Sequence, residues 1–302
     1  RVNETYSDLR VSLCDNTFIP YWIESSNQTS AVVWVNVPSI PPNGTQLYLY
    51  YGNAGAEPAS DGDTTFPFFD DFEGSSLDTS TWTVTGIPVL TDSIITINGN
   101  PENIISKSDI FTSNRAFVAR IKAIHSGTAN LCFGGSKLSH DAFFGGGFSG
   151  HNYFEAHTKD CLFSSWNYLG NSWEGSFAKW EIIRNATTDV KFTVNGATVR
   201  TQTKNLPSID IPIRLATSSS AIPVIECDWV FVRSYTNPEP GHSVWVMEEV
   251  NEIPPSAGFT ANSTNGIAPL TVQFTDTSVG SPVSWQWEFG DGSNSSIQNP
   301  VH

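Results

Sequence analysis

Histidine and aspartate side chains between residues 125 and 160 are the first candidates for chemistry in this 302-residue sequence. The set comprises His125, His140, Asp141, His151, His157 and Asp160. A zinc site requires three or four such ligands that converge on one point. The histidines are separated by 15, 11 and 6 residues, and this spacing matches no local metal-binding motif. The sequence therefore does not predict a zinc site in this segment.

Carboxylates are the second candidates. Glycoside hydrolysis uses two of them, and a Glu-x-Asp-x-Glu run places alternating acids on one face of a strand. The nearest spacing here is Glu226-Cys227-Asp228, which has no third acid. Gly-x-Ser-x-Gly and HExxH motifs are also absent from the sequence. We therefore expect no catalytic residue and no enzymatic activity.

Aromatic residues alternate with glycines between residues 133 and 166. Flat apolar rings beside closely approaching backbone suit a surface on which sugars stack. An alternative is a pair of hairpins with a buried aromatic face and glycine bulges, and the sequence leaves both open. The residues that would stack on a glycan are Phe143, Phe144, Phe148, Tyr153 and Trp166.

Four cysteines are present, with no CxxC motif. In an oxidising compartment they would form one or two disulfides, and three pairings are allowed. Cys132 paired with Cys161 would close a loop within one body. The alternative is four small buried apolar residues. The disulfide candidates are Cys14, Cys132, Cys161 and Cys227.

Six N-x-Ser/Thr sequons lie in turn-like contexts, where glycans are tolerated. The glycosylation candidates are Asn3, Asn27, Asn43, Asn185, Asn262 and Asn294.

The composition points to strands and away from nucleic acid. The chain has 19 Phe, 10 Trp and 8 Tyr, and only 15% of its residues are charged, against a usual level of about 25%. Aromatic residues favour strands. The net charge of −15 disfavours binding to nucleic acid or to anionic membranes. No apolar run approaches the roughly 20 residues that span a bilayer, so we expect no membrane contact within this segment.

A junction between two packed bodies is predicted at residues 66–82, FPFFDDFEGSSLDTSTW. Its four Phe require burial, whereas the acids and small residues beside them belong at a surface. Strands are predicted on both sides of this junction, with a hairpin turn at Asn195-Gly196. The predicted strands are residues 9–13, 31–37, 46–52, 116–123, 180–184, 190–194 and 197–199.

Resemblances to known families extend this interpretation. The phrases YSDLRV, PYWIES, VWVNVPSIPPNGTQLYLYYGN and FFDDFEG, within residues 6–73, resemble the C-terminal half of an uncharacterised β-rich domain. That domain recurs in large secreted and surface proteins, notably of methanogenic archaea. The resemblance implies an extracellular, cell-surface location and an archaeal source, and it implies no activity.

The acidic phrases at residues 70–73 and 77–82 resemble the opening of laminin G-like, concanavalin A-like jelly rolls, and CDWVFVR at 227–233 resembles their closing strand. This resemblance implies two stacked antiparallel sheets. Laminin G-like domains often bind calcium, and the matching acids are Asp70, Asp71 and Asp228. No other cofactor is expected.

Residues 257–261, 266–278 and 285–292 resemble a polycystic kidney disease (PKD) repeat. Trp287 and Phe289 would point into an immunoglobulin-like sandwich, and Gly290-Asp291-Gly292 would form a tight turn. The family more often has Asp where Glu288 stands. The repeat is incomplete, which fits either a fragment of a longer protein or copies that complete one another by strand addition.

The resulting prediction is an all-β chain: a concanavalin A-like jelly-roll sandwich (68–237) between a partial β-rich domain (1–67) and, after a Pro/Glu-rich linker (238–256), a partial PKD repeat (257–302). We predict a non-catalytic extracellular surface or envelope protein, structural or adhesive, that binds other surface proteins or copies of itself and assembles into a filament or sheath. The alternative is a carbohydrate-binding module of a larger secreted protein, with glycans as partners. A degraded or accessory glycosidase domain is a weaker third option.

Overall fold

The computed structural model describes residues 6–53, 55–99, 101–124, 130–137, 140–146, 154–170, 172–218, 223–241, 243, 255–280 and 282–302. The chain divides into two compact units, Arg1–Gly241 and His242–His302. The predicted domain boundary at residue 67 falls inside the first unit, and most of the predicted linker at 238–256 lies outside the described residues.

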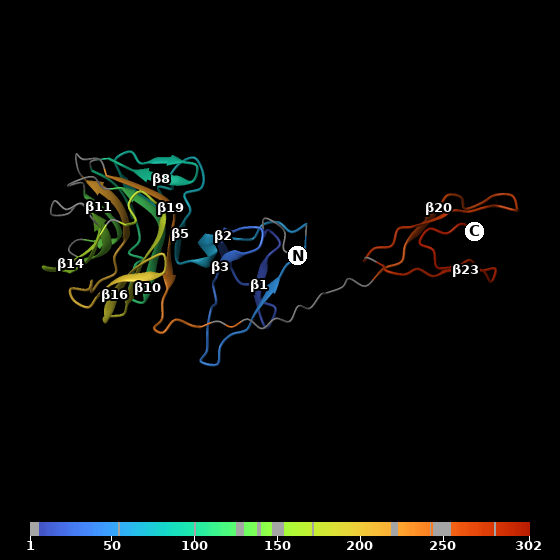
Figure 1. Ribbon diagram of the computed structural model, residues 1–302, viewed down its shortest axis with the longest axis horizontal. Helices are drawn as coiled ribbons and strands as arrows, with labels where there is room; N and C mark the ends of the chain where they lie inside the picture. The colour runs from blue at the N-terminus through green and yellow to red at the C-terminus, as the bar shows by residue number, and fades with distance from the viewer. Residues whose placement is uncertain are drawn as a thin grey trace. The chain divides into compact units, whose positions relative to one another are not determined.

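Two antiparallel sheets form a sandwich in the first unit (Figure 1). The first has eight strands in the described residues, in the order β17 (Ala197–Gln202), β16 (Asp189–Val194), β15 (Ala178–Asn185), β10 (Arg115–Ile124), β19 (Val224–Ser234), β8 (Ile94–Ile97) and β7 (Val89–Thr91), with β5 (Phe68–Asp70) also paired to β19. The second has seven, in the order β14 (Phe163–Gly170), β13 (Phe154–Asp160), β12 (His140–Gly146), β11 (Asn130–Lys137), β18 (Ile213–Ser218), β9 (Glu102–Ser106) and β6 (Trp82–Thr85). This arrangement confirms the predicted all-β sandwich.

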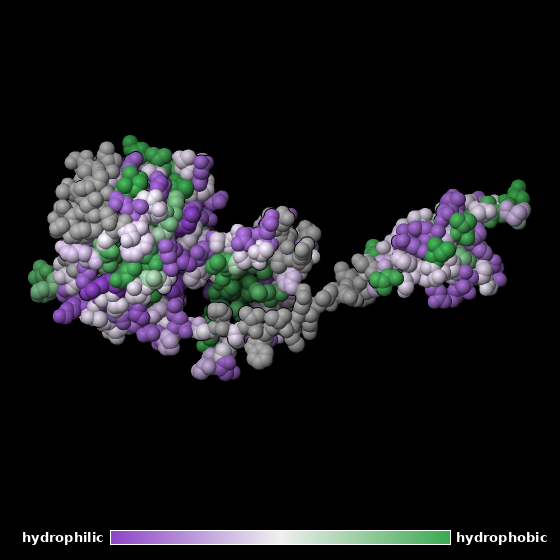
Figure 2. Space-filling view, in the orientation of Figure 1, coloured by the Kyte–Doolittle hydropathy of each residue, from purple (hydrophilic) through white to green (hydrophobic). Residues whose placement is uncertain are grey.

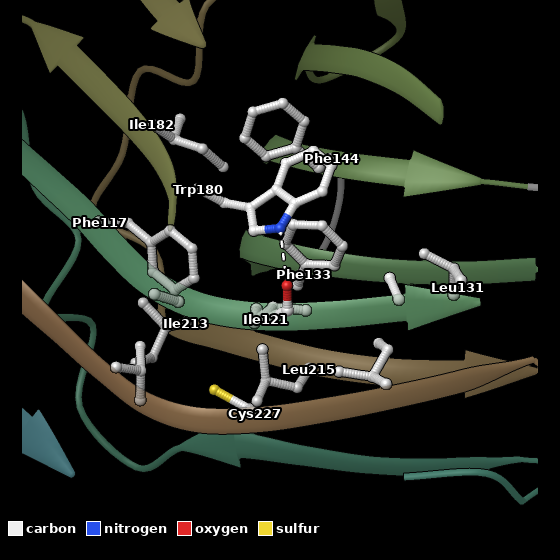
Figure 3. Packing of buried hydrophobic residues seen from close by; sticks show 14 of the residues in the cluster. Phe117, Ile121, Leu131, Phe133, Phe144, Trp180, Ile182, Ile213, Leu215 and Cys227 are labelled. Carbon is white, nitrogen blue, oxygen red and sulfur yellow. Dashed lines mark hydrogen bonds between the residues drawn. The ribbon is translucent and has the colours of Figure 1, made fainter. Parts of the chain in front are cut away.

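Trp180 of β15 lies at the centre of the core between the two sheets (Figure 3). Its ring centroid is 5.1 Å from that of Phe133 and 4.8 Å from that of Phe144, both on the opposite sheet. The indole nitrogen donates a hydrogen bond of 3.0 Å to the carbonyl of Ile121. This bond satisfies a polar group that would be costly to bury unpaired.

The N-terminal part of the first unit contains two antiparallel strand pairs and one helical turn. Strand β1 (Arg10–Leu13) pairs with β4 (Leu47–Tyr50), β2 (Tyr21–Ser26) pairs with β3 (Ala31–Val35), and α1 spans Gly62–Thr65. We call this part, residues 6–65, the N-terminal module. Leu9, Val11, Ile19 and Tyr21 form its own small core.

An aromatic cluster joins the N-terminal module to the eight-stranded sheet. Trp22 of β2 packs on Phe231 of β19 and on Phe66 and Phe69, with ring centroids 5.0 to 5.8 Å apart. Phe68 and Phe72 belong instead to the sandwich core. The four Phe of the predicted junction therefore divide between two clusters, and β19 is buried on both of its faces.

The second unit is also built of short antiparallel pairs: β20 (Phe259–Ala261) with β21 (Phe274–Asp276), and β22 (Trp287–Glu288) with β23 (Asn294–Ser295). Phe274 packs on Trp287 and Phe289, with ring centroids 5.6 and 5.5 Å apart. The predicted Gly-Asp-Gly turn is confirmed, because Gly290 and Gly292 have φ of +86° and +94°. In the described part of the chain, no helix is long and apolar enough to span a membrane.

Candidate functional site

The face of the seven-stranded sheet that points away from the sandwich core carries an unusual set of buried polar groups. We call it the outer face. Because strand side chains alternate, Ala142, Phe144 and Ala156 enter the core. Their neighbours on β12 and β13 lie on the outer face, and all of them are at most 8% exposed: Asp141, Phe143, Glu155 and His157.

Burial shifts the protonation of three of these groups. It raises the pKa of Glu155 to about 7 and, together with the charge of Lys159, lowers the pKa of His157 to about 3. Burial also raises the pKa of Asp141, although Ser136 Oγ donates a 2.7 Å hydrogen bond to its carboxylate. His157 Nδ1 lies 4.0 Å from Asp141 Oδ2. Near neutral pH, Glu155 is thus partly protonated and can donate a proton, while His157 is uncharged.

The two outer-face carboxyls are too far apart along their strands for the usual pairing of a glycosidase. Glu155 is paired with Gly145, and Asp141 is paired with Lys159. Four strand positions separate Asp141 from Gly145, or about 13 Å at about 3.3 Å per residue. Glycosidase carboxyls lie about 5 to 9.5 Å apart. What the outer face offers is one partly protonated carboxyl, Glu155, and a neutral imidazole, His157, that lies near the carboxyl of Asp141.

Two of the residues predicted to stack on a sugar, Phe143 and Phe144, are buried. Phe144 is fully buried in the sandwich core and packs on Phe133 and Phe192, so its predicted role in stacking is wrong. Phe143 does face outward, but it is buried against His157, with ring centroids 4.7 Å apart. Phe148, Tyr153 and the side chain of Trp166 lie outside the described residues.

Tyr168 is an exposed aromatic side chain of the outer face that the sequence interpretation missed. It pairs with Glu155 in the β13–β14 register and is 62% exposed. The pairing of β13 with β14 shifts register between Phe154 and Glu155. Residues 163–170 therefore do not alternate regularly between the two faces of the sheet, and the sequence did not predict a strand there.

The glycines of β11 serve packing. A Cβ at Gly135 would lie 2.5 Å from Ile211 Cδ1 and 2.6 Å from Phe111 Cδ1. Gly134 has φ of +136°, and a Cβ there would lie 2.7 Å from the carbonyl oxygen of Ala142. The alternative interpretation of this segment, hairpins with a buried aromatic face and close glycine packing, is the one that the described residues show.

All four cysteines are free thiols, so the predicted disulfides are wrong for this structure. Cys132 lies on the outer face with Phe143 and Ala216, whereas Cys227 is inside the sandwich core. These two side chains are thus on opposite sides of the seven-stranded sheet. Burial raises the pKa of the Cys132 thiol to about 11. Cys14 and Cys161 are exposed.

The acids predicted to bind calcium have separate structural partners. The Asp70 carboxylate accepts hydrogen bonds from Trp82 Nε1 (2.5 Å) and from the Phe72 amide (2.7 Å). Asp228 pairs with Arg120, and Asp71 accepts a long 3.4 Å bond from the amide of Glu73. The described residues do not bring the three acids together. They do bring together one other group of metal-ligand type: His140, Asp160 and Cys161.

The sequons differ in accessibility. Asn185 begins the turn between β15 and β16, where its carbonyl accepts a 3.0 Å hydrogen bond from the Thr188 amide, but it is only 9% exposed and its side-chain amide donates a 3.0 Å hydrogen bond to Asp189. Asn3 lies outside the described residues. The other four are exposed: Asn27, Asn43, Asn262 and Asn294.

Comparison with known families assigns both ends of the chain. Residues 5–85 match a domain of unknown function, DUF2341. Residues 251–302 match a PKD domain, which confirms the predicted PKD repeat. No curated protein sequence matches the chain.

Solved structures with a related sandwich include several glycoside hydrolases. A glycosyl hydrolase family protein from Mycobacterium fortuitum is 15% identical, with a TM-score of 0.42 over 55% of this chain and 99% of that one. A lichenase from a mouse hindgut metagenome is 10% identical, with a TM-score of 0.45 over 55% and 98%. The binding domain of botulinum neurotoxin serotype D is 12% identical, with a TM-score of 0.45 over 56% and 48%.

These matches correct one prediction. The chain was expected to have no enzymatic activity, and the similar structures include glucanases and a lichenase. At 10 to 16% identity, the likeness describes the fold and assigns no reaction.

Proposed function

We propose that this chain is part of an extracellular surface or envelope protein with a structural or adhesive role, in contact with other surface proteins or with copies of itself. Its match to a PKD domain supports the extracellular location. The aromatic cluster around Trp22 supports a structural role, because it fixes the N-terminal module to the sandwich. The observation that carries the proposal is the exposed strand β4.

Strand β4 is an apolar edge strand. All four of its residues are exposed, with Leu49 at 61%, and in the described chain its one sheet partner is β1. Phe18 packs on Tyr50 and is itself 63% exposed. Figure 2 shows hydrophobic residues gathered on the N-terminal module, which contains β4. An exposed apolar edge is a template for pairing with another strand.

A second copy of the chain fits this edge. Antiparallel pairing centred on Tyr48 places Leu47 of one copy opposite Leu49 of the other, so like residues share a face. Such a pairing is two-fold symmetric and closes at a dimer. A filament or sheath needs a further contact surface, and the second unit offers exposed apolar residues such as Phe259 and Val279.

Sedimentation of the purified chain tests this proposal. We expect concentration-dependent association that Leu49→Lys weakens by about tenfold or more, because charged edge residues block strand pairing. Ile87→Lys is the matched control, since Ile87 is an exposed apolar residue of the same unit outside β4. A wild-type chain that stays monomeric at every concentration would exclude association through β4. Antibody that labels cells only after permeabilisation would exclude a surface location.

Carbohydrate binding is the second candidate, favoured by the outer face. Tyr168 presents an exposed ring there, at the register position opposite the buried Glu155. Rings and convergent polar groups are the usual elements of a sugar site. On a glycan array, Tyr168→Ala should abolish binding. Phe163→Ala is the control, because Phe163 is exposed at the start of the same strand. Equal loss in both variants, or no glycan bound by the wild type, would contradict this candidate.

A further inference from the structure

His140, Asp160 and Cys161 meet where three strands begin or end. His140 opens β12, Asp160 ends β13, and Cys161 follows in the turn to β14. Strands β12 and β13 are antiparallel, and their register pairs Asp141 with Lys159. The start of β12 therefore lies beside the end of β13, and residues 20 positions apart in sequence become neighbours. Local spacing could not reveal this group.

The three ligand atoms have the separations of a tetrahedral face. Cys161 Sγ is 3.5 Å from His140 Nε2, Asp160 Oδ1 is 3.0 Å from the same nitrogen, and Sγ and Oδ1 are 4.0 Å apart. Zinc bonds of about 2.3 Å to sulfur and about 2.0–2.2 Å to nitrogen and oxygen, at tetrahedral angles, give about 3.6, 3.4 and 3.6 Å for these three distances. Each observed distance is thus within a few tenths of an ångström of the ideal.

The contacts do not have the order of a catalytic triad. In a nucleophile–histidine–acid arrangement, the nucleophile contacts one ring nitrogen and the acid contacts the other. Here both Cys161 and Asp160 approach the same atom, His140 Nε2. His140 Nδ1 is buried and has no hydrogen-bond partner among the described residues. This arrangement, with the sulfur and the carboxylate oxygen both close to one ring nitrogen, is expected when the three atoms bind the same metal ion.

Cys161 lies in a tight turn directly after Asp160. Asp160 pairs with Phe163, so Cys161 and Leu162 form a two-residue hairpin loop. Cys161 has φ of +53°, a conformation for which glycine is favoured at this position. The thiol is exposed and forms no disulfide.

We propose that His140 Nε2, Asp160 Oδ1 and Cys161 Sγ bind a divalent transition-metal ion of the zinc class, with water as the fourth ligand. A thiolate and a carboxylate together balance the charge of a divalent ion. Sulfur and imidazole ligands select zinc over calcium or magnesium. Ser208 Oγ donates a 2.9 Å hydrogen bond to Asp160 Oδ1 and so orients the carboxylate, as outer partners of metal ligands do. The metal would fasten the β13–β14 turn to the start of β12.

Metal titration of the full chain, reduced and freed of metal with a chelator, tests the proposal. We expect calorimetry with zinc chloride to show one site. Cobalt as a spectroscopic substitute should give a thiolate charge-transfer band. Cys161→Ser and His140→Gln should each weaken binding by at least the roughly tenfold that loss of a ligand's outer partner costs, because each removes one of the three ligand groups. Cys14→Ser should leave it unchanged, because Cys14 is an exposed cysteine outside this group.

Three results would overturn the site: no stoichiometric binding, a cobalt complex without the thiolate band, or full affinity in Cys161→Ser. If a variant fails to fold, Asp160→Asn provides a second test, and the cobalt spectrum of the wild type decides independently of any substitution. The titration measures neither self-association nor glycan binding, so its outcome is separate from that of the proposed function.

Discussion

Replacement of Glu155 by Gln should change how the stability of the sandwich depends on pH. Glu155 is 2% exposed, and burial raises its pKa from an ordinary value of 4.5 to about 7. Between these two values the folded chain holds a proton that the unfolded chain has released. Rising pH therefore destabilises the folded state across this range, and the effect ends above about pH 7.

The magnitude follows from the size of the shift. About 2.5 pH units at about 1.4 kcal/mol each give a loss of about 3 kcal/mol between about pH 4.5 and 7. Gln cannot ionise and has nearly the same shape as Glu, so the Glu155→Gln variant should not lose stability in this way as the pH rises. His157 acts in the opposite direction: its pKa is lowered from 6.5 to about 3, so rising pH stabilises the fold across that range. The wild type alone would show a partial cancellation of the two effects.

The difference between variant and wild type isolates Glu155. Urea unfolding monitored by tryptophan fluorescence, at pH values from about 4 to 8, should show Glu155→Gln gaining stability over the wild type as pH rises, by about 3 kcal/mol at the upper end. Glu73→Gln is the control, because Glu73 is an exposed carboxylate of the same unit. A difference between Glu155→Gln and wild type that stays constant across this pH range would refute the argument that burial controls this carboxyl.

Three further outcomes are expected. Trp22→Ala should destabilise the first unit by about 3–5 kcal/mol in urea unfolding, since it empties a large ring position against Phe66 and Phe231; a loss below about 1 kcal/mol would mean that the module is not held by this cluster. Gly62→Ala should cost about 1–3 kcal/mol by overpacking, because its Cβ would lie 2.3 Å from the ring of Phe69; an unchanged midpoint would contradict this. Peptide mass spectrometry of the natively expressed protein should find no glycan at Asn185, whose amide is buried, and an occupied Asn185 would show that the site is accessible during folding.

The strands and the junction could be predicted because they depend on local pattern. Strand residues 31–35 and 47–50 lie within the predicted ranges 31–37 and 46–52. At the junction, burial of the four Phe could be predicted, but the way in which they divide could not. Phe66 packs with Phe69, whereas Phe68 and Phe72 enter the sandwich core. Alternation along an extended chain would place Phe66 on the same face as Phe68 and Phe72, and the bend at residues 66 and 67 breaks that alternation.

Which of two neighbouring aromatic rings faces the core could not be predicted in the same way. Phe143 and Phe144 are identical neighbours, and alternation requires one to face the core and the other to face outward. Only the pairing of β12 with β11 and β13 decides that Phe144 enters the core. A shift of register by one residue would exchange the two, so a prediction that treated both as members of one surface was bound to fail for one of them.

The same reasoning applies to the titratable groups. Their chemistry depends on partners supplied by other strands: Asp160 reaches His140 through the β12–β13 pairing, and Glu155 owes its raised pKa to burial on the outer face. Neither the strand pairing nor the burial can be inferred from the spacing of these residues along the chain. Conversely, the acids that looked grouped in sequence, Asp70 and Asp71, are consecutive strand-end residues whose hydrogen bonds lie with Phe72 and Glu73. In an antiparallel hairpin, the first residue of one strand lies beside the last residue of the next, so His140 and Asp160 meet although they are 20 positions apart in sequence.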